Sequence, residues 1–78
     1  MILIRRTASA EKAYLWQRGE RNRRYELKVG AEPSQVLDRG DLFRRIPGRV
    51  HTTDFYDIVT QADRLAEAGD SSTWVTYQ

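Results

Sequence analysis

Residues 23–29, RRYELKV, alternate strictly between apolar and charged side chains after the first arginine. In an extended chain the apolar members fall on one face and the charged members on the other. Tyr25, Leu27 and Val29 form the first set, and Arg24, Glu26 and Lys28 form the second. The stretch predicts a strand with one buried face and one solvent-exposed face.

Toward the N-terminus, the same strand has a candidate partner. Residues 14–18 (YLWQR) are rich in aromatic β-formers, and residues 19–22 (GERN) hold Gly and Asn, which tolerate positive φ. These segments predict a hairpin with residues 23–29. Residues 2–4 (ILI) predict a short buried strand that ends near Arg6, and residues 7–12 predict a loop.

The middle of the chain is less regular. Residues 35–39 (QVLDR) fit either one helical turn closed by Gly40 or a short strand, and the pattern leaves both open. Residues 42–46 (LFRRI) are apolar enough to predict a strand, and Pro-Gly at 47–48 predicts a turn. Residues 49–51 continue either as a return strand or as an extended lead-in to the next element.

An amphipathic helix is predicted to start near Thr53. Its apolar positions recur at i, i+3, i+4, i+7, i+10 and i+11, which makes one continuous stripe. These positions are Phe55, Ile58, Val59, Ala62, Leu65 and Ala66. Thr53 or Asp54 is the expected N-cap, and Asp54 and Asp57 lie near the positive end of the helix dipole. Gly69 suits the left-handed C′ position, and residues 74–77 (WVTY) predict a final strand.

Together these elements predict an α+β fold. A small, mostly antiparallel sheet of about four strands is packed by one amphipathic helix in two layers. The length of 78 residues is that of one domain, so residues 1–78 are expected to fold as a single α+β domain.

Cysteine is absent, which excludes disulfides, thiolate metal sites and cysteine nucleophiles. Because small secreted domains usually depend on disulfides, the composition favours an intracellular, cytoplasmic setting. Residues 1–4 (MILI) are followed at once by Arg5 and Arg6. This apolar run is too short for a signal peptide or a membrane span, so no membrane association is expected.

The sequence offers little for catalysis. His51 is the only histidine, and with Asp54 and Asp57 it has a superficial likeness to a metal-ligand set. A catalytic zinc needs three supported ligands, and both aspartates are explained by the start of the helix. There is no G-x-S-x-G turn, no G-x-G-x-x-G and no P-loop. We therefore expect a protein that is not an enzyme, with no catalytic residues, no metal and no cofactor.

Charge is distributed unevenly along the chain. Before residue 50, twelve Arg and Lys stand against six Asp and Glu, a balance of +6; from residue 50 on, one stands against five, a balance of −4. The arginines gather at the predicted hairpin tip and around the predicted turn at 47–48. The candidate partner-binding residues are Arg18, Arg21, Arg23, Arg24, Arg44, Arg45 and Arg49. Such a cluster suits phosphates or an acidic protein surface.

Other interpretations of these charges stay open. The arginines can be scattered and solvated, and strand alternation sends Arg23 and Arg24 to opposite faces. A row of carboxylates on the predicted helix can imitate a phosphate backbone. Tyr14, Trp16 and Tyr25 can stack nucleobases beside a basic patch, although a chain this short is expected to need them in its core.

In size, Arg/Asp balance and hairpin-plus-helix layout, the whole chain resembles the small accessory proteins of phages and mobile elements. Anti-CRISPR proteins are among these: compact, cofactor-free inhibitors that often cover a nucleic-acid-binding surface of an effector complex. The resemblance implies a binding module that inhibits a protein or a protein–nucleic-acid complex through charge-complementary contacts. Direct DNA or RNA binding through the arginines is the alternative. The oligomeric state is not fixed by the sequence.

Overall fold

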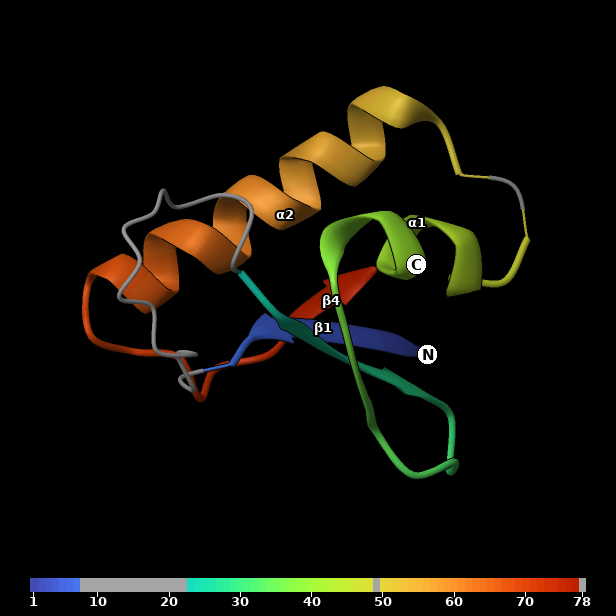
Figure 1. Cartoon of the computed structure of the whole chain (residues 1–78), viewed down its shortest axis with the longest axis horizontal. Coiled ribbons are helices and arrows are strands. Elements are labelled where there is room, and N and C mark those ends of the chain that lie inside the picture. The colour runs from blue at the N-terminus through green and yellow to red at the C-terminus, as the bar shows by residue number, and fades with distance from the viewer. Residues whose placement is uncertain (8–22, 49, 78) are drawn as a thin grey trace.

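A computed structural model of the chain describes residues 1–7, 23–48 and 50–77. Figure 1 shows its elements along the chain. They are β1 (Ile2–Arg6), β2 (Tyr25–Val29), β3 (Gln35–Leu37), α1 (Arg39–Arg45), α2 (Thr52–Glu67) and β4 (Val75–Tyr77). In this part of the chain no helix is long and apolar enough to cross a membrane.

The strands form one antiparallel sheet in the order β3-β2-β1-β4. The predicted α+β class and antiparallel sheet are confirmed, although two helices accompany the sheet where one was expected. The expected hairpin partner, residues 14–18, lies outside the described residues. β2 pairs with β1 over its whole length and with β3 from Tyr25 to Leu27, so both of its edges are occupied there.

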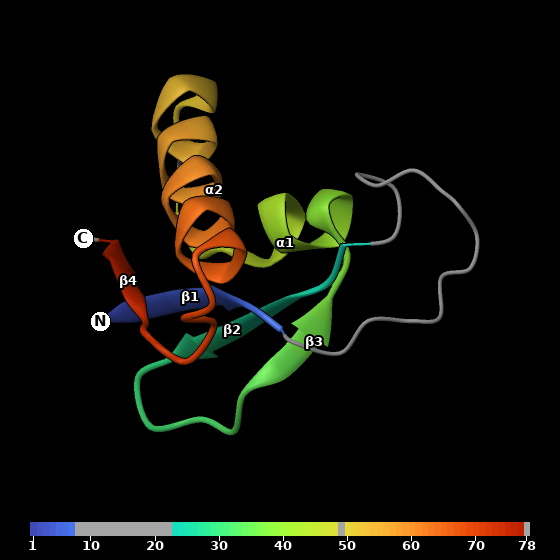
Figure 2. The ribbon, with the colours of Figure 1, turned by 90° about the vertical axis from the view of Figure 1, so that its left-hand side faces the viewer.

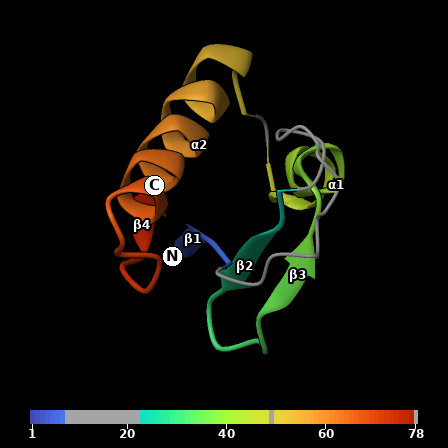
Figure 3. The same ribbon diagram turned by 60° about the vertical axis from the view of Figure 1, so that its left-hand side comes forward.

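The sheet buries one of its faces. Ile4 stands opposite Leu27 on one side and Val75 on the other, and all three are buried, as is Tyr25. The alternation predicted for residues 23–29 is therefore confirmed. Figures 2 and 3 show both helices on the same side of the sheet, with α2 over β1 and β4 and α1 beside β2 and β3. We call the opposite side the open face of the sheet.

α1 corrects the strand predicted for residues 42–46. Asp38 takes the N-cap position with extended backbone, and its Oδ1 accepts a hydrogen bond from the Asp41 backbone N–H at 2.8 Å. Leu42 and Ile46 then fall one helical turn apart and are both buried in the core. The same two residues would also face one side of a strand, so the spacing fits both, and the Asp38 cap is the local feature that favours the helix.

The ambiguous segment before α1 contains both a strand and a helix start. β3 covers Gln35–Leu37, and α1 begins at Arg39 directly after its cap. Gly40 lies in the first turn of α1 and does not close a turn as one alternative had it. The turn predicted at 47–48 is confirmed, since Gly48 adopts a φ of 84°.

α2 confirms the predicted helix and its apolar stripe. Phe55, Ile58, Val59 and Ala62 are buried in the core. The predicted caps are wrong: the helix starts at Thr52, so Thr53 and Asp54 lie inside its first turn. The N-cap is His51, whose extended backbone makes it a lead-in to the helix and whose side chain makes no capping hydrogen bond. Arg49 lies outside the described residues.

The end of α2 matches the prediction for Gly69. Its φ of 89° places it in the left-handed region, and its N–H donates to the Ala66 carbonyl at 3.0 Å. The Asp70 N–H donates to the Leu65 carbonyl at 2.8 Å, which completes a Schellman motif. The chain then reverses into β4, the predicted final strand, which pairs with β1.

Candidate partner-binding surface

The structure separates the seven candidate arginines. Arg18, Arg21 and Arg49 lie outside the described residues. Arg23 and Arg24 precede β2, and Arg44 and Arg45 lie in the last turn of α1. These four do not form one patch, because they enter different sets of contacts.

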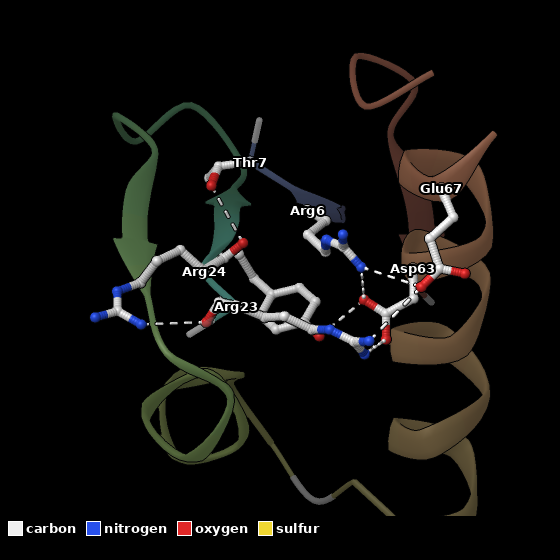
Figure 4. Close-up of polar contacts among 7 residues, drawn as sticks. Arg6, Thr7, Arg23, Arg24, Asp63 and Glu67 are labelled. Carbon is white, nitrogen blue, oxygen red and sulfur yellow. Dashed lines mark hydrogen bonds and ion pairs between the residues drawn. The ribbon is translucent and has the colours of Figure 1, made fainter. Parts of the chain in front are cut away.

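Arg23 is bound inside the domain. Its Nη1 donates to Asp63 Oδ2 at 2.8 Å, while Arg6 Nη1 at 3.1 Å and the Tyr25 hydroxyl at 2.9 Å donate to Asp63 Oδ1. Glu67 Oε2 lies 3.6 Å from both guanidinium groups. Figure 4 shows the Arg6 and Arg23 side chains reaching toward Asp63 and Glu67 on α2. We call Arg6, Arg23, Tyr25, Asp63 and Glu67 the Asp63 cluster.

The electrostatics of the Asp63 cluster indicate a structural role. The Asp63 side chain is only 13% exposed, and two cations face two carboxylates, so the charges balance. Burial, together with the neighbouring Asp63 charge, raises the pKa of Tyr25 to about 12. Burial works to lower the pKa of Arg23, but Asp63, Tyr25 and Glu67 together outweigh it and the pKa is raised. The cluster ties β1 and β2 to α2, which leaves little of Arg23 for a partner.

Arg24 takes the opposite direction, as alternation predicts. Figure 4 shows its side chain pointing away from α2, and its Nη1 donates to the Arg23 carbonyl at 3.3 Å. Lys28 lies on the same side of β2 and donates to the Glu32 carbonyl at 3.1 Å. Neither cation is ion-paired with a carboxylate of the described part of the chain.

Other polar side chains of the open face make their hydrogen bonds and ion pairs within the domain. The Arg5 guanidinium stacks 4.0 Å from the Trp74 ring, and its Nε donates to Glu26 Oε1 at 2.8 Å. Ser34 Oγ donates to Glu26 Oε2 at 2.8 Å. Partial burial works to raise the pKa of Glu26, but the hydrogen bonds from Arg5 and Ser34 lower it. Arg5 therefore joins β1 to β2 and to the lead-in of β4.

Arg44 and Arg45, in the last turn of α1, remain at the surface. Arg44 Nη1 lies 2.7 Å from Asp41 Oδ1, but the two side chains are 69% and 53% exposed. Arg45 Nη1 donates to the neutral Gln35 Oε1 at 2.6 Å. Exposed pairs of this kind contribute only about 0–1 kcal/mol, so these guanidinium groups can exchange their partners at small cost.

Sequence reasoning missed the aromatic residues between the two helices. Phe43 is 41% exposed and Tyr56 is 50% exposed. The Phe43 ring meets the buried Phe55 ring edge-on, with centroids 4.9 Å apart, and the Arg39 guanidinium lies 5.1 Å from the Tyr56 ring centroid. We call Arg39, Phe43, Arg44 and Tyr56 the α1–α2 shoulder. The position of Tyr56 outside the apolar stripe is a sequence signal for its exposure. Phe43 has no such signal, because the pattern of residues 42–46 predicts a strand.

Three of the five acidic residues of α2 and its C-terminal turn make contacts inside the domain. Asp63 and Glu67 are engaged by arginines, and Asp70 accepts from the Thr73 and Ser72 hydroxyls, which lowers its pKa. In the ranges that the structure covers, no group of three or more His, Cys, Asp or Glu side chains is placed to hold a metal ion. His51, Asp54 and Asp57 thus form no such group.

Comparison of the chain with protein-family models, with curated proteins and with solved structures finds no match.

Proposed function

We propose that this chain is a non-enzymatic, cytoplasmic binding module that engages a protein partner through the α1–α2 shoulder. The observation that carries the proposal is the exposure of Phe43 and Tyr56 on adjacent helices. A domain of this size has few large apolar side chains, and it leaves two of its aromatic rings in water. Exposed aromatic residues accompanied by arginine are typical of the residues that dominate binding energy at protein interfaces.

Charge supports the same surface. Arg39 lies against Tyr56, and Arg44 is held only by an exposed pair with Asp41. Charge-complementary contacts at the rim of an apolar centre guide association and exclude wrong partners. We further propose that binding inhibits the partner, as the likeness to small inhibitor proteins of the anti-CRISPR kind implies.

The test is a pull-down that compares the proteins captured from a cell lysate by the wild type and by a shoulder variant. The variant carries Phe43→Ala and Tyr56→Ala, and the control carries Val36→Ala, which truncates an apolar side chain that is 60% exposed on the open face. We expect a protein that the wild type and the control recover equally and that the shoulder variant loses by about tenfold or more. Equal recovery by all three forms, with folding verified by circular dichroism, would remove the shoulder from the proposal.

A second candidate is direct binding of nucleic acid on the open face. It is favoured by Arg24 and Lys28, which lack carboxylate partners in the described ranges, beside the Arg5–Trp74 stack. Binding of this kind weakens steeply with salt, in proportion to the phosphates contacted. Retarded migration of single-stranded DNA or RNA at low salt, lost in Arg24→Glu/Lys28→Glu, would support it. Unretarded migration would exclude it.

A further inference from the structure

We infer that the outer edge of β4 pairs with β4 of a second copy of this chain, so that two sheets join into one. The inference goes beyond the proposed function and does not depend on it, because the shoulder involves α1, which lies beside β2 and β3 and away from β4. Two features carry it: the neutral, β-forming character of β4, and exposed charges on α2 that complement one another across a two-fold axis.

β4 is an edge strand of the sheet. It pairs with β1 on one side, and within the described ranges no strand pairs with its other side. Residues 73–77 (TWVTY) contain no charged residue and no proline, and all of them are typical β-formers. Natural proteins usually protect an exposed edge with charged side chains or proline, and an edge without them is a template for a further strand.

The other edge strand, β3, is better protected. Pro33 lies two residues before β3, and Asp38 follows it directly as the N-cap of α1. Gln35 at the start of β3 accepts a hydrogen bond from Arg45 of α1. A flanking proline and a charged residue disfavour pairing with a further chain, so β4 is the edge available for it.

A register centred on Thr76 pairs the whole of β4 with its copy. Two identical antiparallel strands are related by a two-fold axis, so Thr76 stands opposite its own equivalent and Val75 stands opposite Tyr77 of the second copy. Thr76 is exposed on the open face, whereas Val75 and Tyr77 pack on the side of the core. Thr–Thr pairs and aromatic–β-branched pairs across strands are both favourable.

The same axis brings the two α2 helices side by side. Figures 2 and 3 show α2 over β1 and β4. Because neighbouring strands are about 4.8 Å apart, α2 and its copy would lie about two strand spacings, or about 10 Å, from each other, which is a distance at which helices pack. Helical periodicity places Gln61, Leu65 and Ala68 on the flank opposite Asp63, toward the second copy. All three are neutral, and Leu65 is only partly buried.

The exposed charges of α2 complement those of a second copy. The Asp63 cluster takes up Asp63 and Glu67, and the charges left are Asp54, Asp57 and Arg64, which have no ion pair within the described ranges. Asp57 and Arg64 are seven residues apart, so they lie on one line along the exposed side of the helix. A two-fold axis near the middle of α2 makes the helices antiparallel and brings Asp57 of each copy to Arg64 of the other. Asp54 stays in the first turn of its own helix, where the dipole favours a carboxylate.

The other charged side chains near β4 are engaged within the domain. Asp70 accepts from the Ser72 and Thr73 hydroxyls, and Arg5 donates to Glu26 and to the Ser72 carbonyl. No charged side chain of β4 itself therefore opposes the approach of an identical edge, and the reciprocal pairs on α2 favour it.

The experiment is sedimentation equilibrium of the full chain. We expect the wild type to pass from monomer to dimer as its concentration rises from about 5 to about 500 µM. Thr76→Lys sets two like charges opposite each other at the axis and should weaken association by about tenfold or more. The matched control is Val36→Lys, which changes the middle residue of β3, exposed on the open face, and should leave the dimer unchanged. Circular dichroism verifies that each variant is folded.

Charge reversal identifies the second copy as the partner. Asp57→Arg and Arg64→Glu should each weaken self-association by about three- to tenfold, because each turns both attractive pairs into repulsive ones. An equal mixture of these two variants should associate as the wild type does, since every pair in the mixed dimer is again between opposite charges.

Four results would overturn the inference. A wild type that stays monomeric over this range would exclude a second copy and leave the edge to a strand of another protein. A dimer that is lost in Val36→Lys and kept in Thr76→Lys would use the other edge. Unchanged association of the two charge-reversed variants, or no recovery in their mixture, would contradict the antiparallel pairing of α2 on which the inference stands.

Discussion

The Asp63 cluster and the α1–α2 shoulder both contain arginines, but the arginines of the cluster are tied into the fold and Arg44 of the shoulder is exposed. In the cluster, Arg6 and Arg23 reach one carboxylate that is 13% exposed and that also accepts from Tyr25. In the shoulder, Arg44 pairs with a neighbour on its own helix and stays 69% exposed. The difference shows that an arginine cluster in a sequence does not define a binding patch. What decides is whether the fold brings a shielded carboxylate to the guanidinium, as it does for Arg23 and not for Arg44.

The two regions also differ in what they connect. The Asp63 cluster joins the positive first part of the sequence to the negative last part, since Arg6 and Arg23 are 57 and 40 residues from Asp63. Inside the molecule, this pairing offsets two of the five carboxylates that follow residue 50. The Arg44–Asp41 pair spans three residues and stabilises only its own helix. The charged side chains that remain available to a partner are those that the fold has not placed in a shielded ion pair.

Replacement of Phe55, the buried ring beneath the shoulder, should have the largest effect on the free energy of unfolding. Phe55→Ala leaves a cavity in the core and is expected to lower the free energy of unfolding by about 4 kcal/mol. Phe43→Ala, on the exposed side of the same ring pair, should cost below about 1.5 kcal/mol. Urea denaturation of both variants measures this. Similar losses would mean that Phe43 is part of the core and would break the distinction between shoulder and core.

Removal of the Asp63 carboxylate should come next. Asp63→Ala leaves Arg6 and Arg23 without their shared acceptor and the Tyr25 hydroxyl without its bond, at a cost of about 3 kcal/mol. The control is Glu67→Gln, which loses only contacts of 3.6 Å and should cost below about 1 kcal/mol. Thermal unfolding distinguishes them. If Asp63→Ala unfolds no earlier than Glu67→Gln, the cluster is not structural.

Alkaline pH should weaken the cluster through Tyr25. Its pKa is raised from 10.0 to about 12 in the folded protein, so the folded state holds the proton more tightly than the unfolded state. This contribution is fully present below about pH 10 and is lost as the pH rises from about 10 to about 12. Urea denaturation across this range should show falling stability in the wild type and a flatter dependence in Tyr25→Phe. Parallel profiles would contradict the assignment.

Local patterns in the sequence were sufficient for much of the fold. The alternation around Leu27 and the stripe from Phe55 to Ala66 report which face is buried, and Gly69 reports a helix end, because each is set by neighbouring residues. α1 was missed although Asp38 precedes Asp41 by three residues, the spacing of a cap and its N3 partner. The cap of α2 was also misplaced, since Thr53 and Asp54 are good capping residues and His51 caps without its side chain.

The candidate site was less accessible to sequence reasoning. The capture of Arg23 by Asp63 depends on the strand register of β2 and on where α2 crosses it, and no short-range pattern encodes either. The opposite directions of Arg23 and Arg24 followed from alternation alone and were predicted. The contact of Phe43 with Phe55 depends on how two helices pack, and the sequence pattern of residues 42–46 predicts a strand where one of these helices lies.

The most direct test compares two double-mutant cycles by urea denaturation: Arg23→Ala with Asp63→Ala, and Arg44→Ala with Asp41→Ala. We expect a coupling free energy of about 2 kcal/mol for the Arg23–Asp63 pair, which is shielded and shared with Tyr25. For the exposed Arg44–Asp41 pair we expect below about 0.5 kcal/mol. Equal coupling in the two cycles would contradict the division of the arginines into structural ones and ones available to a partner.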